Sequence, residues 1–282
     1  MRVAVVGAGR WGCMHASKLA LHPEVDLVAI VDVDAVRAME AARVYGAQHW
    51  CTHVEESLGL ADAYTVAVPI GQLVSVTERL VANGKHVLVE KPGAVSAARL
   101  RKIARAAKSA GVVVGVGYLE RFNAAAAGLR RGVRDLVIWR AAPSRPRASG
   151  MALDWTCHDI DLALWLTNDA LTLSAVDGDF ERSVRLKLAG TQGAEVRLQT
   201  RSCRQAVRRR VWADGQRVDL VRSAGDALQE QIAAFVGWAQ GRARGHLATI
   251  DEAIEVLELL GAISTGEVEG VEANGARSLH LE

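Results

Sequence analysis

A short apolar run near the beginning of the chain leads directly into three closely spaced glycines. Residues 2–6, Arg-Val-Ala-Val-Val, are typical of a parallel strand covered on both faces, and Gly7, Gly9 and Gly12 follow it. A helical pattern then occupies about residues 11–21. A strand, a tight glycine turn and a helix form the first part of a βαβ unit, which commits this part of the chain to a layered α/β fold.

The same alternation continues through the first 117 residues. Further apolar, β-branched runs predict buried strands at 27–31, 64–68, 86–89 and 112–116, with helical patterns between them at 35–45, 71–83 and 96–110. Gly46, Gly84 and Gly111 follow three of these helices, where a left-handed C-terminal cap is expected. Residues 1–117 are therefore predicted to form a doubly wound parallel sheet of the Rossmann type.

The pattern changes in residues 118–282. Strand-like alternation is found at 134–141, 171–177, 182–188, 194–201 and 207–213, and helical patterns at 122–132, 158–167, 226–240 and 250–265. The strands turn over at Gly and Asp positions, as antiparallel strands do, and 142–150 is a loop by composition. We predict a second, α+β domain with an open, antiparallel-rich sheet.

The glycine turn has the spacing of a nucleotide-binding loop. Gly7 allows the tight turn, Gly9 lets the backbone approach a pyrophosphate, and Gly12 lets the helix pack closely on the strand. The helix that follows offers unpaired N–H groups to phosphates. The alternative is a glycine turn without a ligand. Because the turn lies between a strand and a helix, we predict a dinucleotide site.

An acidic residue at the end of the second strand indicates which dinucleotide binds. Asp32 would accept hydrogen bonds from the adenosine ribose hydroxyls and repel a 2′-phosphate, so NAD is expected rather than NADP. Arg37 is the opposing observation, although an exposed helix face is its expected place, and Asp34 is expected to cap the helix. The complete set of expected cofactor contacts is Gly7, Ala8, Gly9, Arg10, Trp11, Gly12, Asp32, Val68, Pro69, Glu90 and Lys91.

Lys91 lies in the run Glu90-Lys91-Pro92, directly after the predicted strand at 86–89. Ligands of open α/β sheets bind at the carboxyl ends of the strands, and proline fixes the backbone there. A lysine near a reacting hydroxyl can polarise it, stabilise a developing alkoxide or shuttle its proton. The alternative is an ordinary surface lysine in a turn.

Asp154 and His158 are four residues apart, so both side chains fall on one face if this segment is helical. Histidine is a natural general acid and base near neutral pH, and a neighbouring carboxylate can orient it. The alternative is a capping aspartate beside a histidine of the core. Asp159 and Asp161 are further carboxylates in the same segment.

Charge and cysteine content narrow the class of protein. The 34 basic and 32 acidic residues leave a net charge of +2, and the arginine-rich stretch 201–210 is interrupted by Val and Ala, so we expect no nucleic-acid or membrane partner. No apolar run approaches the roughly 18 residues of a membrane span, and no signal peptide is expected.

The four cysteines form no CxxC pair, which favours free thiols in the cytoplasm and no metal site. Cys157 is either a reactive thiol or a small buried residue.

Together and in this order, these motifs resemble the glucose–fructose oxidoreductase / inositol dehydrogenase / MocA (Gfo/Idh/MocA) family. The resemblance covers nearly the whole chain and is most specific at residues 82–92 and 154–162. It implies a Rossmann domain followed by an α/β domain whose large open sheet makes a homodimer or homotetramer. It also implies that Lys91, Asp154 and His158 bind or deprotonate a sugar or cyclitol hydroxyl.

The segment 117–123, Gly-Tyr-Leu-Glu-Arg-Phe-Asn, resembles a branch of the family that oxidises the 3-hydroxyl of UDP-N-acetylglucosamine or its uronic acid. On this basis Tyr118, Arg121, Asn123 and Trp155 are candidate substrate contacts, although Arg121 could instead brace the domain junction and Trp155 could be a core residue. The chain departs from the family pattern at Leu73, Ala124 and Trp155-Thr156, and its second domain is short. These departures bear on the substrate more than on the chemistry.

The sequence therefore predicts an NAD-dependent dehydrogenase that acts on a sugar or nucleotide sugar. His158 is the expected acid/base, Lys91 the residue that polarises oxygen, and Asp154 the residue that orients the pair. The alternatives are a cyclitol or aldose dehydrogenase, a ketosugar or imine reductase on the same scaffold, and a non-catalytic protein that senses NAD.

Overall fold

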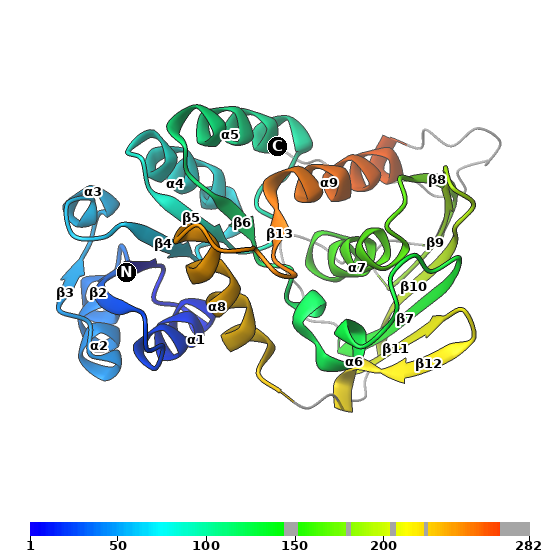
Figure 1. Cartoon of the computed structure of the whole chain (residues 1–282), viewed down its shortest axis with the longest axis horizontal. Helices are drawn as coiled ribbons and strands as arrows, with labels where there is room; N and C mark the ends of the chain where they lie inside the picture. Colours follow the sequence, from blue (N-terminus) through cyan, green and yellow to red (C-terminus); the bar gives the residue numbers. More distant parts are fainter. Residues whose placement is uncertain (144–151, 179–181, 204–206, 223–224, 266–282) are drawn as a thin grey trace. The chain divides into compact units, whose positions relative to one another are not determined.

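The computed structural model describes residues 1–143, 152–178, 182–203, 207–222 and 225–265 (Figure 1). The chain forms two compact units. The first is Met1–Tyr118 with Leu228–Ile254, and the second is Leu119–Ala227 with the residues from Glu255 onward. The expected division into 1–117 and 118–282 did not include the return of Leu228–Ile254 to the first unit.

The first unit is built on a seven-stranded sheet in the order β13-β6-β5-β4-β1-β2-β3. Its strands are β1 (Arg2–Val6), β2 (Asp26–Val31), β3 (His49–Cys51), β4 (Ala63–Val66), β5 (His86–Val89), β6 (Val114–Val116) and β13 (Ala248–Thr249). All the pairings are parallel except that of β13 with β6. Strands β4 and β6 are fully buried, β1 and β2 are buried except for their first residues, and the edge strand β3 is mostly exposed; the predicted doubly wound Rossmann sheet is confirmed.

Helices α1 (Arg10–Ala20), α2 (Ala35–Tyr45), α3 (Val54–Ser57), α4 (Ile70–Ala82), α5 (Ala97–Ala110) and α8 (Ala227–Ala239) belong mainly to this unit. In Figure 1, α1 contacts α2 on one side of the sheet and α4 contacts α5 on the other. Gly46 and Gly111 are left-handed C-caps with φ of 73° and 67°, whereas Gly84 (φ 70°) follows the cap residue Asn83. Helix α9 (Ile250–Thr265) begins in the first unit and continues into the second.

The second unit contains a six-stranded sheet in the order β12-β11-β7-β10-β9-β8. The strands are β7 (Asp135–Pro143), β8 (Leu171–Gly178), β9 (Ser183–Gly190), β10 (Glu195–Cys203), β11 (Arg208–Ala213) and β12 (Gln216–Asp219). Among the described strands, only β7 and β10 pair in parallel, so the sheet is mostly antiparallel, as predicted. One face carries the buried residues Leu136, Ile138, Val196 and Leu198 and packs against α7 (Cys157–Thr167).

The helix predicted at 122–132 is replaced by two shorter elements, η1 (Leu119–Phe122) and α6 (Ala124–Ala127). Asn123 separates them because its side chain accepts a hydrogen bond from the N–H of Ala125 and caps α6. Gly128 ends α6, and Gly132 is left-handed with φ of 83°. The prediction of one continuous helix was therefore wrong. Of the loop predicted at 142–150, residues 142 and 143 are the end of β7 and the remainder lies outside the described residues.

Among the residues that the structure describes, no helix combines the length and the apolar character needed to cross a membrane. None of the four cysteines forms a disulfide.

Candidate functional site

Two glycines of the turn after β1 are required by the packing of the protein itself. Gly7 has φ of 98°, donates its N–H to the carbonyl of Val31 at 2.7 Å, and has no room for a Cβ beside the carbonyl of Ala67. A Cβ on Gly12 would overlap the carbonyl of Gly7. The turn and the close packing of α1 on β1 thus have the geometry that the sequence predicted.

Gly9 differs from these two glycines. It is exposed, has an unstrained φ of −74°, and a Cβ built on it would meet no atom within 4 Å. It is also the N-cap of α1, and no side chain caps this helix, so its first N–H groups have no side-chain capping acceptor. The missing side chain leaves the helix N-terminus accessible, which is the arrangement that a phosphate group requires.

The carboxylate of Asp32 is fixed beside this turn. Its Oδ2 accepts a hydrogen bond from the N–H of Ala8 at 2.7 Å, and its Oδ1 accepts one from the N–H of Asp34 at 2.9 Å. Arg37 reaches back from α2, with Nη2 at 3.2 Å from Asp32 and Nε at 3.2 Å from Asp34. Arg37 is therefore half-exposed on α2, as expected, but it also faces the carboxylate that was expected to select the cofactor.

A pocket of about 320 Å³ in the first unit is lined by Gly7, Gly9, Asp32 and Arg37, among others. Its walls include the predicted cofactor residues Gly7, Gly9, Asp32, Val68 and Pro69, while Arg10 and Trp11 are exposed at the start of α1. Five further polar residues that were not predicted as cofactor contacts also line it, namely Thr52, His53, Glu55, Gln72 and Arg79. Thr52 and His53 follow β3, so recognition of that three-residue strand would have indicated them.

Glu90 and Lys91 follow β5 at the carboxyl edge of the same sheet. Oε1 of Glu90 lies 2.9 Å from Nε2 of His15, which is fully buried on α1. Gly117 makes room for this carboxylate, because a Cβ at that position would lie 3.3 Å from Oε1. Lys91 is partly buried, and its peptide bond to Pro92 is cis. Glu90 thus connects the lysine segment to the helix that follows the glycine turn.

Asp154 and His158 belong to the second unit, at the point where two helical geometries meet. Asp154 lies in the π-helical turn η2 (Ala152–Thr156), and His158 lies in the first turn of α7. Both side chains are partly exposed, whereas Cys157 is fully buried and donates its thiol hydrogen to the carbonyl of Leu153 at 3.0 Å. π-Helical turns are often found at functional sites. The structure thus places Asp154 and His158 on one continuous helical segment and Lys91 in the other unit.

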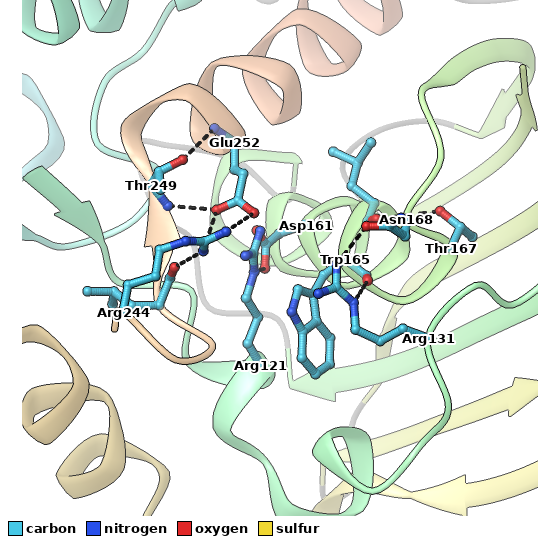
Figure 2. Close-up of polar contacts among 11 residues, drawn as sticks. Arg121, Arg131, Asp161, Trp165, Thr167, Asn168, Arg244, Thr249 and Glu252 are labelled. Carbon is cyan, nitrogen blue, oxygen red and sulfur yellow. Dashed lines mark hydrogen bonds and ion pairs between the residues drawn. The ribbon is translucent and has the colours of Figure 1, made fainter. Parts of the chain in front are cut away.

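The candidate substrate contacts are engaged within the protein to different degrees. Arg121 is 1% exposed and makes a bidentate ion pair with Asp161, at 2.7 to 3.1 Å (Figure 2). Asn123 donates to the carbonyl of Leu220 at 2.7 Å while it caps α6. Because Arg121 and Asp161 both belong to the second unit, their ion pair favours a structural role within that unit, and not at the domain junction, over the alternative of substrate recognition. Tyr118 is buried, and Trp155 is half-buried in the π turn.

The pocket in the first unit fits NAD. An open helix N-terminus at Gly9 suits the pyrophosphate, and the fixed carboxylate of Asp32 suits the ribose hydroxyls. Within the described part of the chain, no group of three or more His, Cys, Asp or Glu side chains is arranged to hold a metal ion.

Comparison with known proteins agrees with this geometry. Residues 1–118 match the Gfo/Idh/MocA family model, described as an oxidoreductase family with an NAD-binding Rossmann fold. Inositol 2-dehydrogenase of Rhizobium meliloti (strain 1021) is 26% identical over 249 residues, which are 82% of this chain and 76% of the relative. UDP-N-acetylglucosamine 3-dehydrogenase of Acidithiobacillus ferrooxidans is 30% identical over 173 residues, which are 59% of this chain and 54% of the relative.

The fold is likewise shared with solved structures. GenD2 from gentamicin A biosynthesis, solved in complex with NAD, matches with a TM-score of 0.80 at 23% identity, over 93% of this chain and 92% of that one. The resemblance read from the motifs is confirmed, and so is the expectation of NAD as the cofactor. Residues 1–118 belong to the NAD-binding Rossmann domain of the Gfo/Idh/MocA family of oxidoreductases.

Proposed function

We propose that this protein transfers a hydride between NAD and a CH–OH group of a sugar, nucleotide sugar or cyclitol. The observation that carries the proposal is the position of three groups at the carboxyl edge of one parallel sheet. Gly9 follows β1, Asp32 follows β2 and Lys91 follows β5. In open α/β sheets this edge is where ligands bind, so the lysine shares its edge with the cofactor pocket.

Each proposed role follows from the chemistry of the side chain. Bound NAD supplies the hydride acceptor or donor at its nicotinamide ring. Lys91 polarises the substrate oxygen with its ammonium group, and His158 removes the hydroxyl proton during oxidation and returns it during reduction. Asp154 orients the imidazole of His158. The protein thus contributes positioning and electrostatics.

Among substrates, we propose a nucleotide sugar of the UDP-N-acetylhexosamine class, with a cyclitol or aldose as the second candidate. The support for the nucleotide sugar is the segment 117–123 and the 30% identity to UDP-N-acetylglucosamine 3-dehydrogenase. The support for the cyclitol is the longer alignment with inositol 2-dehydrogenase. Because Arg121 and Asn123 are engaged within the protein, contacts by these two side chains do not add to the case for the nucleotide.

Two alternatives compete with this proposal. One is another enzyme on the same scaffold, a ketosugar or imine reductase, in which NADH would deliver the hydride to a C=O or C=N carbon. The other is a non-catalytic NAD sensor, which would need the pocket but not the acid/base residues. The presence of Lys91, Asp154 and His158 together favours an enzyme over a sensor.

Mass spectrometry of the purified protein should first identify the bound cofactor and any ligand that copurifies with it. Turnover should then be followed through NADH formation with UDP-N-acetylglucosamine, its uronic acid, myo-inositol, scyllo-inositol and glucose. Oxidation of a UDP-sugar alone supports the first candidate, and oxidation of inositol or glucose alone rejects it. NAD binding without turnover of any compound, in either direction, would favour the sensor.

The proposal includes a homodimer or homotetramer in the cytoplasm. The oligomer is supported by the family resemblance, and the location by four cysteines that form no disulfide. Light scattering coupled to gel filtration measures the oligomeric state, and a monomeric mass would reject an oligomer. Fractionation of cells that express the chain measures the location.

A further inference from the structure

A network of buried ion pairs lies against the first turn of α7. The guanidinium of Arg140 makes a bidentate contact with Asp159, at 2.6 to 3.0 Å, and Nη2 of Arg140 also lies 3.3 Å from Oε1 of Glu120. The hydroxyl of Thr200 donates to Asp159 at 2.9 Å, and Arg209 donates to Glu120. Asp159 is 1% exposed, and Arg140 and Glu120 are each 5% exposed.

The strand register explains why these side chains meet. Arg140 on β7 is directly opposite Thr200 on β10 and directly opposite Arg209 on β11. The three residues therefore form one row across the inner face of the sheet, the face that packs against α7. Arg140 occupies a position in the alternation of β7 where its neighbours Leu136 and Ile138 are apolar and buried. A charged residue at such a position needs a partner, and α7 supplies Asp159.

The network balances its own charge. Two guanidinium groups, those of Arg140 and Arg209, face two carboxylates, those of Glu120 and Asp159. Although burial opposes the charged form, the charges of Asp159 and Glu120 raise the pKa of Arg140 above its ordinary value. Because each carboxylate of the network has a cationic partner, removing one carboxylate leaves a buried cation short of a counter-charge.

The start of α7 is held by buried side-chain contacts: Asp159 is bound to Arg140, and Asp161, one half-turn further on, is bound to Arg121. The N-cap of the helix, Thr156, makes no side-chain capping hydrogen bond, and the first turn follows directly on the π-helical turn η2. Asp159 is the residue next to His158, and adjacent residues of an α-helix project about 100° apart. Fixing Asp159 on the sheet therefore fixes the rotation of the helix about its axis, and with it the direction in which the side chain of His158 projects.

We propose that Arg140 and Asp159 are positioning residues for His158, holding its imidazole in the orientation that proton transfer requires. The inference rests on the proposed function, in which His158 is the acid/base. In this proposal the network serves the reaction as well as the stability of the second unit. Misplacement of a reacting group by about 1 Å can lower a rate by about a hundredfold.

The test compares two buried carboxylates at opposite ends of α7. Asp159→Asn keeps the size of the side chain and removes its charge, and Arg140→Lys keeps the charge and removes the planar fork. The matched control is Asp169→Asn. Asp169 is 6% exposed, follows the C-terminal end of α7, and accepts hydrogen bonds from Thr191 and the N–H of Gln192. Both Asp variants are expected to lower the melting temperature.

Only Asp159→Asn and Arg140→Lys are expected to change catalysis. The rate is measured on the substrate that the turnover panel identifies. Asp159→Asn should lower kcat by about 10- to 100-fold, with little change in KM for NAD. In the pH–rate profile, the fall of the rate toward low pH should become less steep. Arg140→Lys should show a smaller loss of kcat than Asp159→Asn, and Asp169→Asn should keep kcat near that of the unmodified protein. If Asp159→Asn loses stability to the same extent as Asp169→Asn and keeps kcat and the pH profile, the positioning role is rejected.

A second measurement is independent of turnover. In protein labelled with ¹⁵N-histidine, the imidazole signals of His158 are identified by their absence in His158→Asn. Asp159→Asn should shift or broaden these signals, whereas Asp169→Asn should leave them in place. If no compound is turned over, the proposed function fails, but the imidazole signals still decide whether the network orients His158. Unchanged signals in Asp159→Asn would overturn the inference.

Discussion

The guanidinium of Arg37 lies 3.2 Å from the carboxylate of Asp32, at the wall of the cofactor pocket. The pair places a cation beside the carboxylate that would otherwise repel a 2′-phosphate. The side chain of Arg37 is 54% exposed and is paired with Asp32 and Asp34, whereas Asp32 is also held by the N–H groups of Ala8 and Asp34. Cofactor choice therefore depends on which of the two side chains faces the ribose.

We expect NAD(H) to bind more tightly than NADP(H), because the fixed carboxylate of Asp32 accepts hydrogen bonds from the two ribose hydroxyls and repels a 2′-phosphate dianion. Asp32→Ser should narrow the difference, and in Asp32→Ser/Arg37→Ala the gain for NADP(H) should disappear. Fluorescence quenching titrations with both cofactors measure the ratio of affinities. Equal or tighter binding of NADP(H) by the unmodified protein would transfer the selecting role to Arg37.

Gly9 and Gly12 should respond in opposite ways to the same added methyl group. Gly9→Ala meets no protein atom, so the melting temperature should stay close to that of the parent, while NAD affinity falls by about tenfold or more, or ~1.4 kcal/mol. Gly12→Ala overlaps the carbonyl of Gly7 and should reduce folded yield. Calorimetry and NAD titration separate the two effects. Unchanged NAD affinity in Gly9→Ala would mean that the pyrophosphate does not approach this glycine.

The repeating units of the first domain could be predicted because their signals are local. Each long strand is an apolar run, each helix has its own period, and the turn glycines occupy fixed positions. Strand β3 (His49–Cys51) and helix α3 (Val54–Ser57) were missed because three or four residues are too few to display a period. Since Thr52 and His53 follow β3, two residues of the pocket wall were missed for the same reason.

The contacts of the second unit depend on pairings that no local pattern specifies. The parallel pairing of β7 with β10 sets Arg140 opposite Thr200, and Arg121 meets Asp161 forty residues away. An arginine in an alternating strand is usually assigned to the exposed face. Leu136, Ile138 and Arg140 lie on the same face of β7, because side chains alternate along a strand. The two apolar residues were therefore the available signal that Arg140 points inward.

Catalysis should depend on Lys91 and His158 far more than on the thiol of Cys157. Lys91→Met and His158→Asn should each lower turnover by roughly 100- to 10,000-fold and leave NAD affinity nearly intact. Cys157→Ser should be mild, because a hydroxyl can also donate to the carbonyl of Leu153. Steady-state rates and NAD titrations of the three variants test this. Near-normal turnover by Lys91→Met on the true substrate would reject the proposed mechanism.

Stability should fall as the pH falls below about 6.5, in part because of His86. Burial lowers the pKa of His86, and its Nδ1 accepts a hydrogen bond from the N–H of Val113 at 3.1 Å, which requires an unprotonated nitrogen. The unfolded chain therefore takes up this proton at higher pH than the folded protein does, so the stabilisation is complete above the unfolded pKa and is lost as the pH falls toward the folded pKa.

His86→Asn supplies an amide oxygen that can accept the same hydrogen bond and does not titrate. Between about pH 7.5 and about pH 5.5, its melting temperature should fall less than that of the parent protein. The pKa of His22 is also lowered, mainly by burial, and His22 is present in both proteins, so it does not affect the comparison. The same pH dependence in both would show that His86 does not contribute.

Arg121→Ala should reveal whether this side chain braces the second unit or binds substrate. Arg121 and Asp161 are 1% and 0% exposed, and removing the guanidinium leaves a buried carboxylate without its ion-pair partner. Breaking such a pair costs about 3–5 kcal/mol of unfolding free energy. The control is Arg197→Ala, which removes an exposed ion pair with Asp135 and should cost less than about 1 kcal/mol.

Replacing both partners, as in Arg121→Met/Asp161→Leu, should recover much of the stability, because no buried charge remains. Urea unfolding measures the loss and the recovery, and the Michaelis constant for a UDP-sugar is measured on the same variants. The bracing role predicts a large loss of stability in Arg121→Ala and recovery in the double variant. An unchanged unfolding free energy with a raised Michaelis constant would instead make Arg121 a substrate contact, and would restore direct nucleotide recognition by the segment 117–123.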